Sequence, residues 1–219
     1  MSSKDKVENL LNKYSDSTLF RAGVNAIPYV GGTLDILLSS GIQKKSQERF
    51  QSLLSELEYQ LKCIEGDKLN YTYLESEEFY DLFVQISNLA VRTRLQEKIK
   101  IYANILTSSL ILEFQNNTKA EDVLNIIEGL TENDIILIKL ISEYLELDNA
   151  DKVNSNKVFS SSSFSNFSND FTEEFIIIGL LRLLKNSLIF KNHVQHAPIN
   201  GQKFQTTPMF HIVKEFICK

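Results

Sequence analysis

Histidine is the side chain best suited to acid–base and metal chemistry near neutral pH, and this chain has three. His193, His196 and His211 all lie near the C-terminal end. His193 and His196 are three residues apart in a predicted strand and loop, so a regular strand would point them to opposite faces. A metal pair would need a bend and a further ligand. We therefore interpret these histidines as exposed residues and predict no metal site and no cofactor.

Paired carboxylates are the second feature that could do chemistry. Glu77–Glu78 and Glu173–Glu174 each fall in the first turn of a predicted helix, where the helix dipole stabilises negative charge without a catalytic role. The chain has no Walker phosphate loop, no GxGxxG after a strand, and no HExxH or GxSxG motif. We assign no catalytic residue and expect that the protein is not an enzyme.

The composition is that of a globular domain. The 219 residues are 43% hydrophobic and 23% charged, with only eight Gly and three Pro, which disfavours turn-rich all-β folds. The two cysteines, Cys63 and Cys218, are too few for a disulfide scaffold or a Cys-built zinc site. Cys63 falls on an apolar helical face and is expected to be buried. The polar N-terminus lacks the apolar core of a secretion signal, so we expect a cytoplasmic protein.

Apolar residues at helical spacing predict an antiparallel helical body over residues 1–148. The clearest helix is Lys44–Ile64, and a tyrosine-rich loop with Tyr71 and Tyr73 follows it. The period of a later helix breaks at Thr93, so that either a second helix starts there and runs to Phe114, or one bent helix continues. Capping residues are expected at Ser76, Thr118 and Thr131.

The remaining residues differ in composition from the body. Residues 149–170 are rich in Ser and Asn and predict a surface loop, which three phenylalanines, Phe159, Phe164 and Phe167, can pin in part. Thr172 starts a helix that is apolar nearly all round, so we expect it to be buried on several sides. Next come a hairpin, Leu188–Val194 with Lys203–Gln205, and a helix that starts at Thr207 and Pro208. This order predicts a winged-helix-like part over residues 171–219.

The stretch Leu19–Ile42 is nearly uncharged, yet its uninterrupted apolar part, Ala22–Leu34, is shorter than the ~20 residues that span a bilayer. One interpretation is a buried helical hairpin. The other is a segment that is stored in the folded protein and later reaches a membrane or a protein partner. The candidate residues for that contact are Ile27, Pro28, Tyr29, Val30, Gly31, Gly32, Leu34, Ile36 and Leu37.

Charge is spread unevenly along the chain. The net charge is -5; Thr172–Lys219 holds six basic and three acidic residues (+3), which leaves 17 basic and 25 acidic residues (-8) elsewhere. An acidic body repels nucleic acid, so we expect weak binding at most. The candidate nucleic-acid contacts are Arg182, Lys185, Lys191 and Lys203. The predicted recognition helix has few polar side chains for base edges, which favours a protein-binding wing.

Several short phrases of the sequence resemble the bacterial Abi-alpha family, named for abortive infection. They are AIPYVGGTLDILL from Ala26, QERFQSLLSEL from Gln47, Tyr102–Leu106, IIEGLTENDIILIKLI from Ile126, and TTPMFHIVKEFIC from Thr206. They are spread along most of the chain, from Ala26 to Cys218, although Met209–Phe210 stands where the family tends to have Gly. The resemblance implies a role in bacterial phage defence and supplies no catalytic residues.

We therefore expect a mainly α protein, with an antiparallel helical bundle followed by a winged-helix-like module that carries one hairpin. The expected function is non-enzymatic phage defence through contact with a protein partner, self-association or membrane engagement. A DNA-binding transcriptional regulator and a scaffold subunit of a larger complex are the alternatives. Membrane engagement would place the protein at the periphery of the inner face of the membrane.

Overall fold

The computed structural model describes residues 44–64, 68–111, 119–147, 158–164, 171–192 and 202–218. Over these residues the chain is mainly helical with one two-stranded antiparallel hairpin, which confirms the predicted mainly α fold class. The chain divides into two compact units, Met1–Asn125 and Ile126–Lys219, and each is described by itself. The apolar stretch Leu19–Ile42 and the contact residues predicted in it lie outside the described residues.

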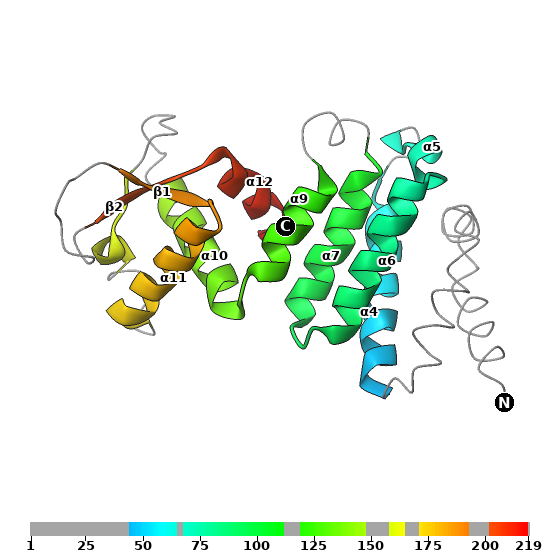
Figure 1. Ribbon diagram of the computed structural model, residues 1–219, viewed down its shortest axis with the longest axis horizontal. Helices are drawn as coiled ribbons and strands as arrows, with labels where there is room; N and C mark the ends of the chain where they lie inside the picture. The colour runs from blue at the N-terminus through cyan, green and yellow to red at the C-terminus, as the bar shows by residue number, and fades with distance from the viewer. Residues whose placement is uncertain are drawn as a thin grey trace. The chain divides into compact units, whose positions relative to one another are not determined.

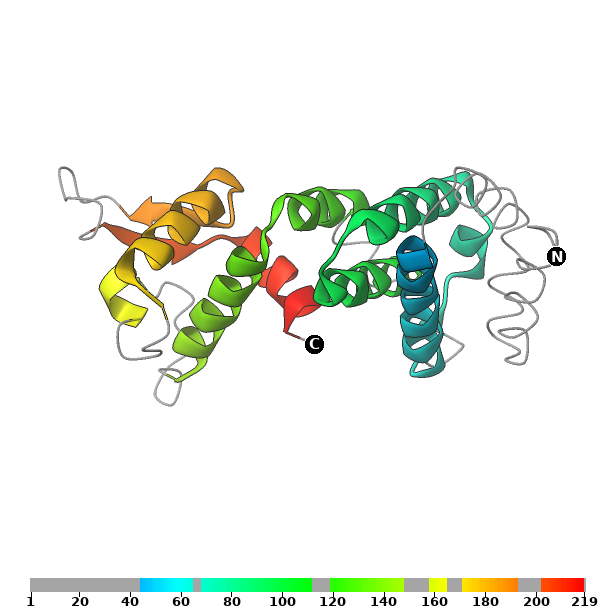
Figure 2. The ribbon, with the colours of Figure 1, turned by 90° about the horizontal axis from the view of Figure 1, so that it is seen from below.

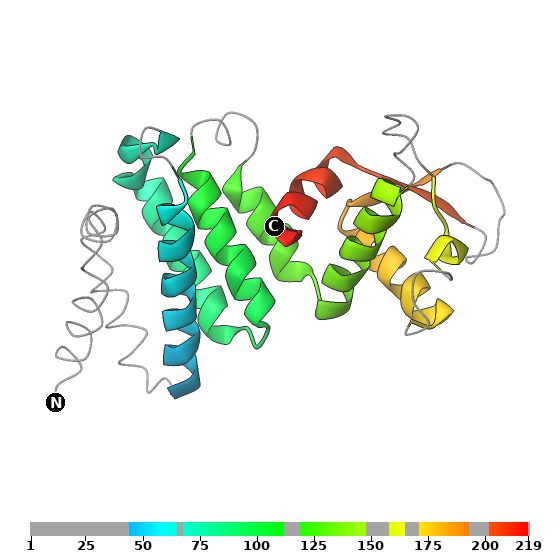
Figure 3. The same ribbon diagram turned by 180° about the vertical axis from the view of Figure 1, so that it is seen from behind.

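Three long helices lie side by side in the first unit, with a short helix at one end (Figures 1 and 3). They are α4 (Lys44–Lys62), the short α5 (Tyr71–Leu74), α6 (Glu77–Arg92) and α7 (Gln96–Ser109). Only three residues connect α6 to α7, so these two helices run antiparallel and pack against each other. Helix α4 packs against both of them.

Helix α4 is held by the apolar face that its sequence predicts. Phe50, Leu53, Leu54 and Leu57 are all buried, and they recur at the helical spacing that places them on one side. Glu48 and Tyr59 lie off this face and are exposed. The predicted helix is therefore confirmed, with its end at Lys62 instead of Ile64.

The ends of α6 and α7 test the capping predictions. The Ser76 hydroxyl accepts a hydrogen bond from the Phe79 amide at 3.2 Å, which confirms the predicted N-cap of α6. The break at Thr93 is also present, but Thr93 is the extended C-cap of α6 and its hydroxyl accepts from the Leu95 amide. The prediction that Thr93 caps α7 is thus wrong: α7 begins after Leu95 with no side-chain cap.

Three further expectations for the first unit are wrong. Tyr71 and Tyr73 lie in helix α5 and not in a loop, because the Asn70 side chain accepts a hydrogen bond from the Tyr73 amide and caps that turn. Cys63 is exposed, since α4 ends one residue before it. Helix α7 stops at Ser109, well before Phe114, and Ile111 pairs with Leu69 in an isolated β-bridge.

Helices α9 (Ala120–Gly129) and α10 (Glu132–Leu147) follow. The cap predicted at Thr118 lies outside the described residues. The cap predicted at Thr131 is confirmed and is reciprocal. The Thr131 amide and hydroxyl donate to Asp134 Oδ2 at 2.8 and 2.7 Å, while the Asp134 amide donates to Thr131 Oγ1 at 3.3 Å.

The second unit combines α10 with the C-terminal elements (Figure 2). These are the 3₁₀-helix η2 (Ser161–Phe164), α11 (Glu173–Lys185), β1 (Ile189–Asn192), β2 (Lys203–Thr206) and α12 (Pro208–Ile217). Helix α11 packs against α10, η2 and β1, and α12 packs against α10. The sequence analysis assigned the residues of α10 to the helical body; in the structure α10 lies with α11 and α12.

The hairpin has the antiparallel register Ile189↔Thr206 to Asn192↔Lys203. On its other edge, β2 forms a single bridge in which Phe159 and Phe204 exchange both backbone hydrogen bonds, at 3.0 and 2.7 Å. Phe159 and Phe164 are each 1% exposed, which confirms that they pin the Ser-rich loop. Phe167 and residues 193–201, which connect the two strands, lie outside the described residues.

Helix α12 matches its prediction in detail. The Thr207 hydroxyl accepts a hydrogen bond from the Phe210 amide at 3.2 Å, and Pro208 occupies the first turn. Its predicted apolar face is buried: Phe210, Val213, Phe216 and Ile217.

Candidate interaction surface on helix α11

Helix α11 begins at a cap that the sequence predicts. The Thr172 hydroxyl accepts a hydrogen bond from the Phe175 amide at 3.2 Å. Glu173 and Glu174 lie in the first turn, where the helix dipole favours them. Just before the helix, the Phe171 ring stacks on the Phe175 ring with centroids 4.8 Å apart. The N-terminal end of α11 therefore carries two exposed carboxylates beside an aromatic pair.

One side of α11 is packed tightly on α10. Its buried residues are Ile176, Gly179, Leu180 and Leu183. Gly179 is required at this contact, because a Cβ there would lie 2.5 Å from Cδ2 of the fully buried Leu137. The absence of a side chain at Gly179 thus sets how closely the two helices approach.

The other end of α11 turns sharply into β1. The Leu188 amide donates to the Leu183 carbonyl and the Ser187 amide to the Leu184 carbonyl, which is the Schellman arrangement of a helix end. Ser187 has a positive φ of 58°, a conformation that favours glycine. The Thr207 hydroxyl lies 2.9 Å from the Ser187 carbonyl and 3.0 Å from the Leu188 carbonyl, so the start of α12 supports this turn.

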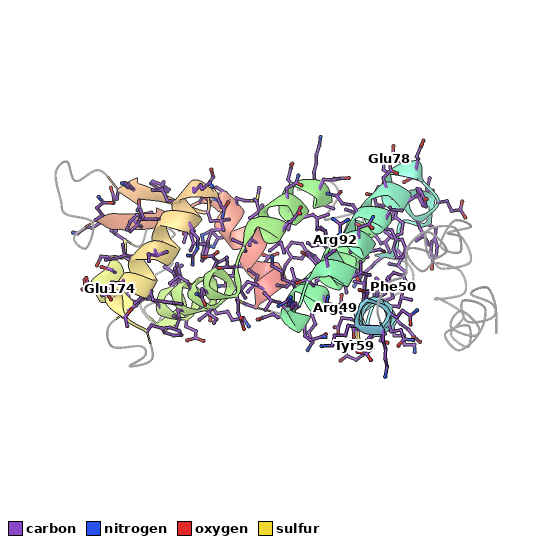
Figure 4. The ribbon with its side chains drawn as sticks, turned by 60° about the horizontal axis from the view of Figure 1, so that its bottom comes forward. Arg49, Phe50, Tyr59, Glu78, Arg92 and Glu174 are labelled. Carbon is purple, nitrogen blue, oxygen red and sulfur yellow. The ribbon has the colours of Figure 1, made fainter. Side chains whose placement is uncertain are left out.

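The side of α11 opposite its buried residues is exposed and partly apolar. Ile178 is 52% exposed and Leu181 is 38% exposed. Glu174 and Lys185 are exposed as well, and the spacing of four, three and four residues places all four side chains on one face. We call these four residues the α11 face; Figure 4 labels Glu174, at its N-terminal end. The expectation that α11 is buried on several sides is therefore wrong.

The structure gives Arg182, a predicted nucleic-acid contact, a structural partner. Its Nε donates to Oδ1 of Asp134 at 2.7 Å, and Asp134 is fully buried at the start of α10. Because Thr131 satisfies the other carboxylate oxygen, the Asp134 carboxylate is both paired and hydrogen-bonded. The Arg182 side chain is one-third exposed and ties α11 to the first turn of α10.

The other three predicted nucleic-acid contacts are exposed and lie on three elements. Lys185 is in the last turn of α11, Lys191 is on β1 and Lys203 starts β2. Lys203 lies opposite Asn192 in the hairpin, whereas Lys191 lies opposite Phe204. The two lysines are therefore in neighbouring cross-strand pairs and do not face each other directly. Phe190, between Ile189 and Lys191, is 46% exposed.

Of the three histidines, the structure describes His211, whereas His193 and His196 lie outside the described residues. His211 is exposed on α12 and lies 3.0 Å from Thr206 Oγ1. Partial desolvation lowers its pKa, the Lys214 ammonium lowers it further, and the Glu215 carboxylate opposes them. Among the described residues, no group of three His, Cys, Asp or Glu side chains could hold a metal ion.

A shallow groove of about 480 Å³ lies in the first unit between α4 and α7. Most of its lining residues are polar or charged, with Glu48 and Glu56 on α4 facing Gln96 and Lys100 on α7, and Ile99 is the apolar one. No described helix is long and apolar enough to cross a bilayer. The groove has no group of metal ligands among the described residues, so the α11 face remains the strongest candidate interaction surface.

The sequence analysis missed the α11 face, although a signal was present. FIIIGLLRLL has apolar residues on more than one side of the helix, whereas a helix that packs on one neighbour needs a single apolar stripe. The additional apolar residues led to the expectation of deep burial.

Comparison with known proteins adds no assignment: no family model, no curated protein and no solved structure matches this chain.

Proposed function

We propose that this chain is a non-enzymatic protein that acts through protein contact, and that the α11 face is where its partner docks. The observation that carries the proposal is the exposure of Ile178 and Leu181 in the middle of that face. Each apolar side chain that a partner covers contributes free energy by leaving water. Glu174 and Lys185, at the two ends, can fix the orientation of a partner that has the opposite charges.

The same face is poorly suited to DNA, the main alternative. The order α10, the Phe159 bridge, η2, α11, hairpin and α12 supports the proposed winged-helix-like module, in which α11 would be the recognition helix and would present its N-terminal residues to base edges. In α11 those residues are Glu173 and Glu174, which would repel the phosphates. Arg182 is engaged by Asp134, which leaves Lys185, Lys191 and Lys203 for the backbone. We therefore favour a winged-helix-like module that binds protein.

The biological role that we propose is bacterial phage defence, and it rests on the resemblance to the Abi-alpha family. In such a role, a protein of this kind would act in the cytoplasm by engaging a host or phage protein. The scaffold alternative uses the same face, since a subunit of a permanent complex also needs an apolar contact surface.

The test is a double variant, Ile178→Ser with Leu181→Ser, made in the full chain and expressed in bacteria challenged with a panel of phages. Both side chains are exposed, so we expect the unfolding midpoint to be retained and protection against phage to be lost. The matched control is Tyr59→Ser with Tyr71→Ser, which removes exposed aromatic rings from the first unit.

Full protection by the α11 double variant, in a background where the wild-type chain protects, would show that the α11 face does not bind the partner. A wild-type chain that protects against none of the phages would reject the defence role. Sequence-specific DNA binding that is lost on Lys185→Gln with Lys203→Gln would favour the transcriptional regulator instead.

A further inference from the structure

One end of the first unit brings three helix ends together. Helix α4 begins there, α6 ends there and α7 begins three residues later. The Arg49 guanidinium on α4 donates to the Val91 carbonyl in the last turn of α6 at 3.0 Å, which joins two of these ends. The groove that residues 48–56 of α4 share with the first residues of α7 places the start of α7 beside them. Figures 1 and 3 show these helix ends at the lower side of the unit, and Figure 4 labels Arg49 and Arg92.

This end of the unit is strongly basic. Five exposed cations lie within the three helix ends and the α6–α7 connection, and we call them the basic end: Lys44, Lys45, Arg92, Arg94 and Lys100. The nearby carboxylates are Glu48, which is exposed and 4.0 Å from the Lys44 ammonium, and the half-buried Glu56 and Glu97. Cations therefore dominate this surface even though the whole chain has a net charge of -5.

The opposite end of α6 has the reverse charge. Exposed Glu75, Glu77, Glu78 and Asp81 lie around its start, where Figure 4 labels Glu78. The exposed Lys62 and Lys68 lie at this end as well, so the exposed side chains leave a smaller negative surplus there than the positive surplus of the basic end. An anionic surface would attract the basic end and repel the acidic end, and so would orient the bundle.

The sequence immediately before the basic end carries few charges. Leu19–Ile42 contains only Arg21 and Asp35 as charged residues, and it stops two positions before Lys44, where α4 begins. Any structure that binds the basic end would therefore meet the apolar stretch at its point of attachment. Stable attachment to a membrane takes two signals, and an apolar group beside a cluster of cations is one such pair.

We propose that the basic end is a docking surface for a bilayer that contains anionic lipids. The cations would attract the phosphate headgroups, and a bilayer also supplies an apolar phase for the apolar sequence that precedes α4. Nucleic acid offers the phosphates but no apolar phase, so the juxtaposition of cations and apolar sequence favours lipid. This proposal goes beyond the protein contact proposed above and shares no residue with the α11 face.

The expected effect follows from the charge. Each Lys or Arg beside an anionic membrane contributes about fivefold to the partition coefficient, and the effect fades within a Debye length. The variant Arg92→Gln, Arg94→Gln, Lys100→Gln removes three such cations. We therefore expect its affinity for anionic vesicles to fall by about a hundredfold.

The test is flotation of the full chain with vesicles of pure phosphatidylcholine and with vesicles in which one lipid in three is phosphatidylglycerol. The matched control variant, Lys185→Gln, Lys191→Gln, Lys203→Gln, removes the same charge from exposed positions in the second unit. We expect the wild-type chain and the control to bind the anionic vesicles alone, and high salt to weaken this binding. The unfolding midpoints of both variants are measured in parallel, so that a loss of binding is scored only in a folded chain.

Four results would overturn the proposal. They are no binding of the wild-type chain to anionic vesicles, equal binding to neutral vesicles, an equal loss in both triple variants, and retained binding by the first variant. A parallel measurement uses duplex DNA: if DNA binding falls in the first variant while vesicle binding does not, the basic end is a nucleic-acid surface. Phage protection in the α11 double variant is measured separately, so each proposal can fail alone.

Discussion

Helices α7 and α11 show that the apolar content of a helix does not determine how deeply it is buried. Helix α7, QEKIKIYANILTSS, contains many polar residues, yet ten of its residues are buried, including Lys98, Thr107 and Ser109. Helix α11, EEFIIIGLLRLLK, is far more apolar, yet only four of its residues are buried. The more polar of the two helices is the one at the centre of a packed unit.

The difference comes from the length of the neighbouring elements: α4 and α6 have 19 and 16 residues, whereas η2 and β1 have four residues each. Helix α7 packs against α4 and α6, so side chains on more than one of its sides leave solvent. The Thr107 hydroxyl is satisfied there by the Ala103 carbonyl at 2.8 Å and by Gln60 Oε1 at 3.1 Å. Helix α11 packs against α10, η2 and β1 on one side, and this leaves Ile178 and Leu181 in solvent. Apolar surface beyond what the fold buries is available to a partner.

The sharpest test of this comparison uses the same residue type in both helices. Ile105 in α7 is 0% exposed and Ile178 in α11 is 52% exposed. Ile105→Ala leaves a cavity and should reduce the free energy of unfolding by about 3 kcal/mol. Ile178→Ala should change it by less than about 0.5 kcal/mol. Urea unfolding of the full chain, followed by circular dichroism, measures both.

Similar losses from the two isoleucine variants would contradict the comparison, because Ile178 would then be as well packed as Ile105. A loss confined to Ile178→Ala would contradict the packing of α7 as well. The m-values should match that of the wild-type chain, since neither substitution changes the surface that unfolding exposes.

The second prediction compares helix caps in the two units. Asp134→Ala removes the side-chain half of the reciprocal cap of α10 and the partner of Arg182, and should reduce the free energy of unfolding by about 2 kcal/mol. The loss is limited because Arg182 is one-third exposed and can be rehydrated. Ser76→Ala removes a single capping bond from α6, for which about 1 kcal/mol is expected. If Ser76→Ala were the more damaging, the Arg182–Asp134 pair would add nothing to the cap.

The third prediction compares two helical glycines and expects opposite signs. Gly179→Ala forces a Cβ against Leu137, which should outweigh the gain in helix propensity and destabilise by about 1 kcal/mol net. Gly129→Ala has its nearest foreign atom at 3.8 Å, so it should be neutral or stabilise by up to about 1 kcal/mol. Thermal unfolding midpoints distinguish the two signs. A stabilising Gly179→Ala would show that Leu137 yields readily and that α10 and α11 are loosely packed.

The features that could be predicted from the sequence are the local ones. The caps at Ser76, Thr131, Thr172 and Thr207 each depend on a side chain and an amide three residues later, so a short stretch of sequence contains the whole interaction. The prediction at Thr93 failed because the capping pattern cannot tell a helix start from a helix end. The Thr93 side chain bonds two residues ahead, to the Leu95 amide.

The features that could not be predicted depend on residues far apart in the chain. Arg182 pairs with Asp134, which lies 48 positions earlier in the chain. No local sequence pattern distinguishes such a paired arginine from an unpaired one that could contact nucleic acid. The basic end likewise combines cations from the start of α4 with others from the α6–α7 connection and α7. The exposure of Ile178 and Leu181 depends on how much of α11 is covered by η2 and β1. The spacing of apolar residues along α11 does not contain that information.

The smallest expected effect is a pH dependence confined to the second unit. All three histidines of the chain follow residue 192, so the first unit contains no imidazole, the side chain whose ordinary pKa lies between pH 5 and 8. In the second unit, the pKa of His211 is lowered by desolvation and by Lys214. Folding therefore favours the neutral imidazole, which lies 3.0 Å from Thr206 Oγ1.

The sign of the effect follows from the lowered pKa. The contribution of His211 to stability is fully present above its unfolded pKa of about 6.5 and is lost as the pH falls through the folded value, because the unfolded chain binds the proton more readily. Since the His211 side chain is exposed, we expect a loss of only a few tenths of a kcal/mol. Urea midpoints of the wild-type chain and His211→Gln should run parallel above about pH 7 and converge or cross toward pH 5. A wild-type midpoint that rises relative to the variant on acidification would mean that the folded protein favours the imidazolium, and would reverse the assigned direction.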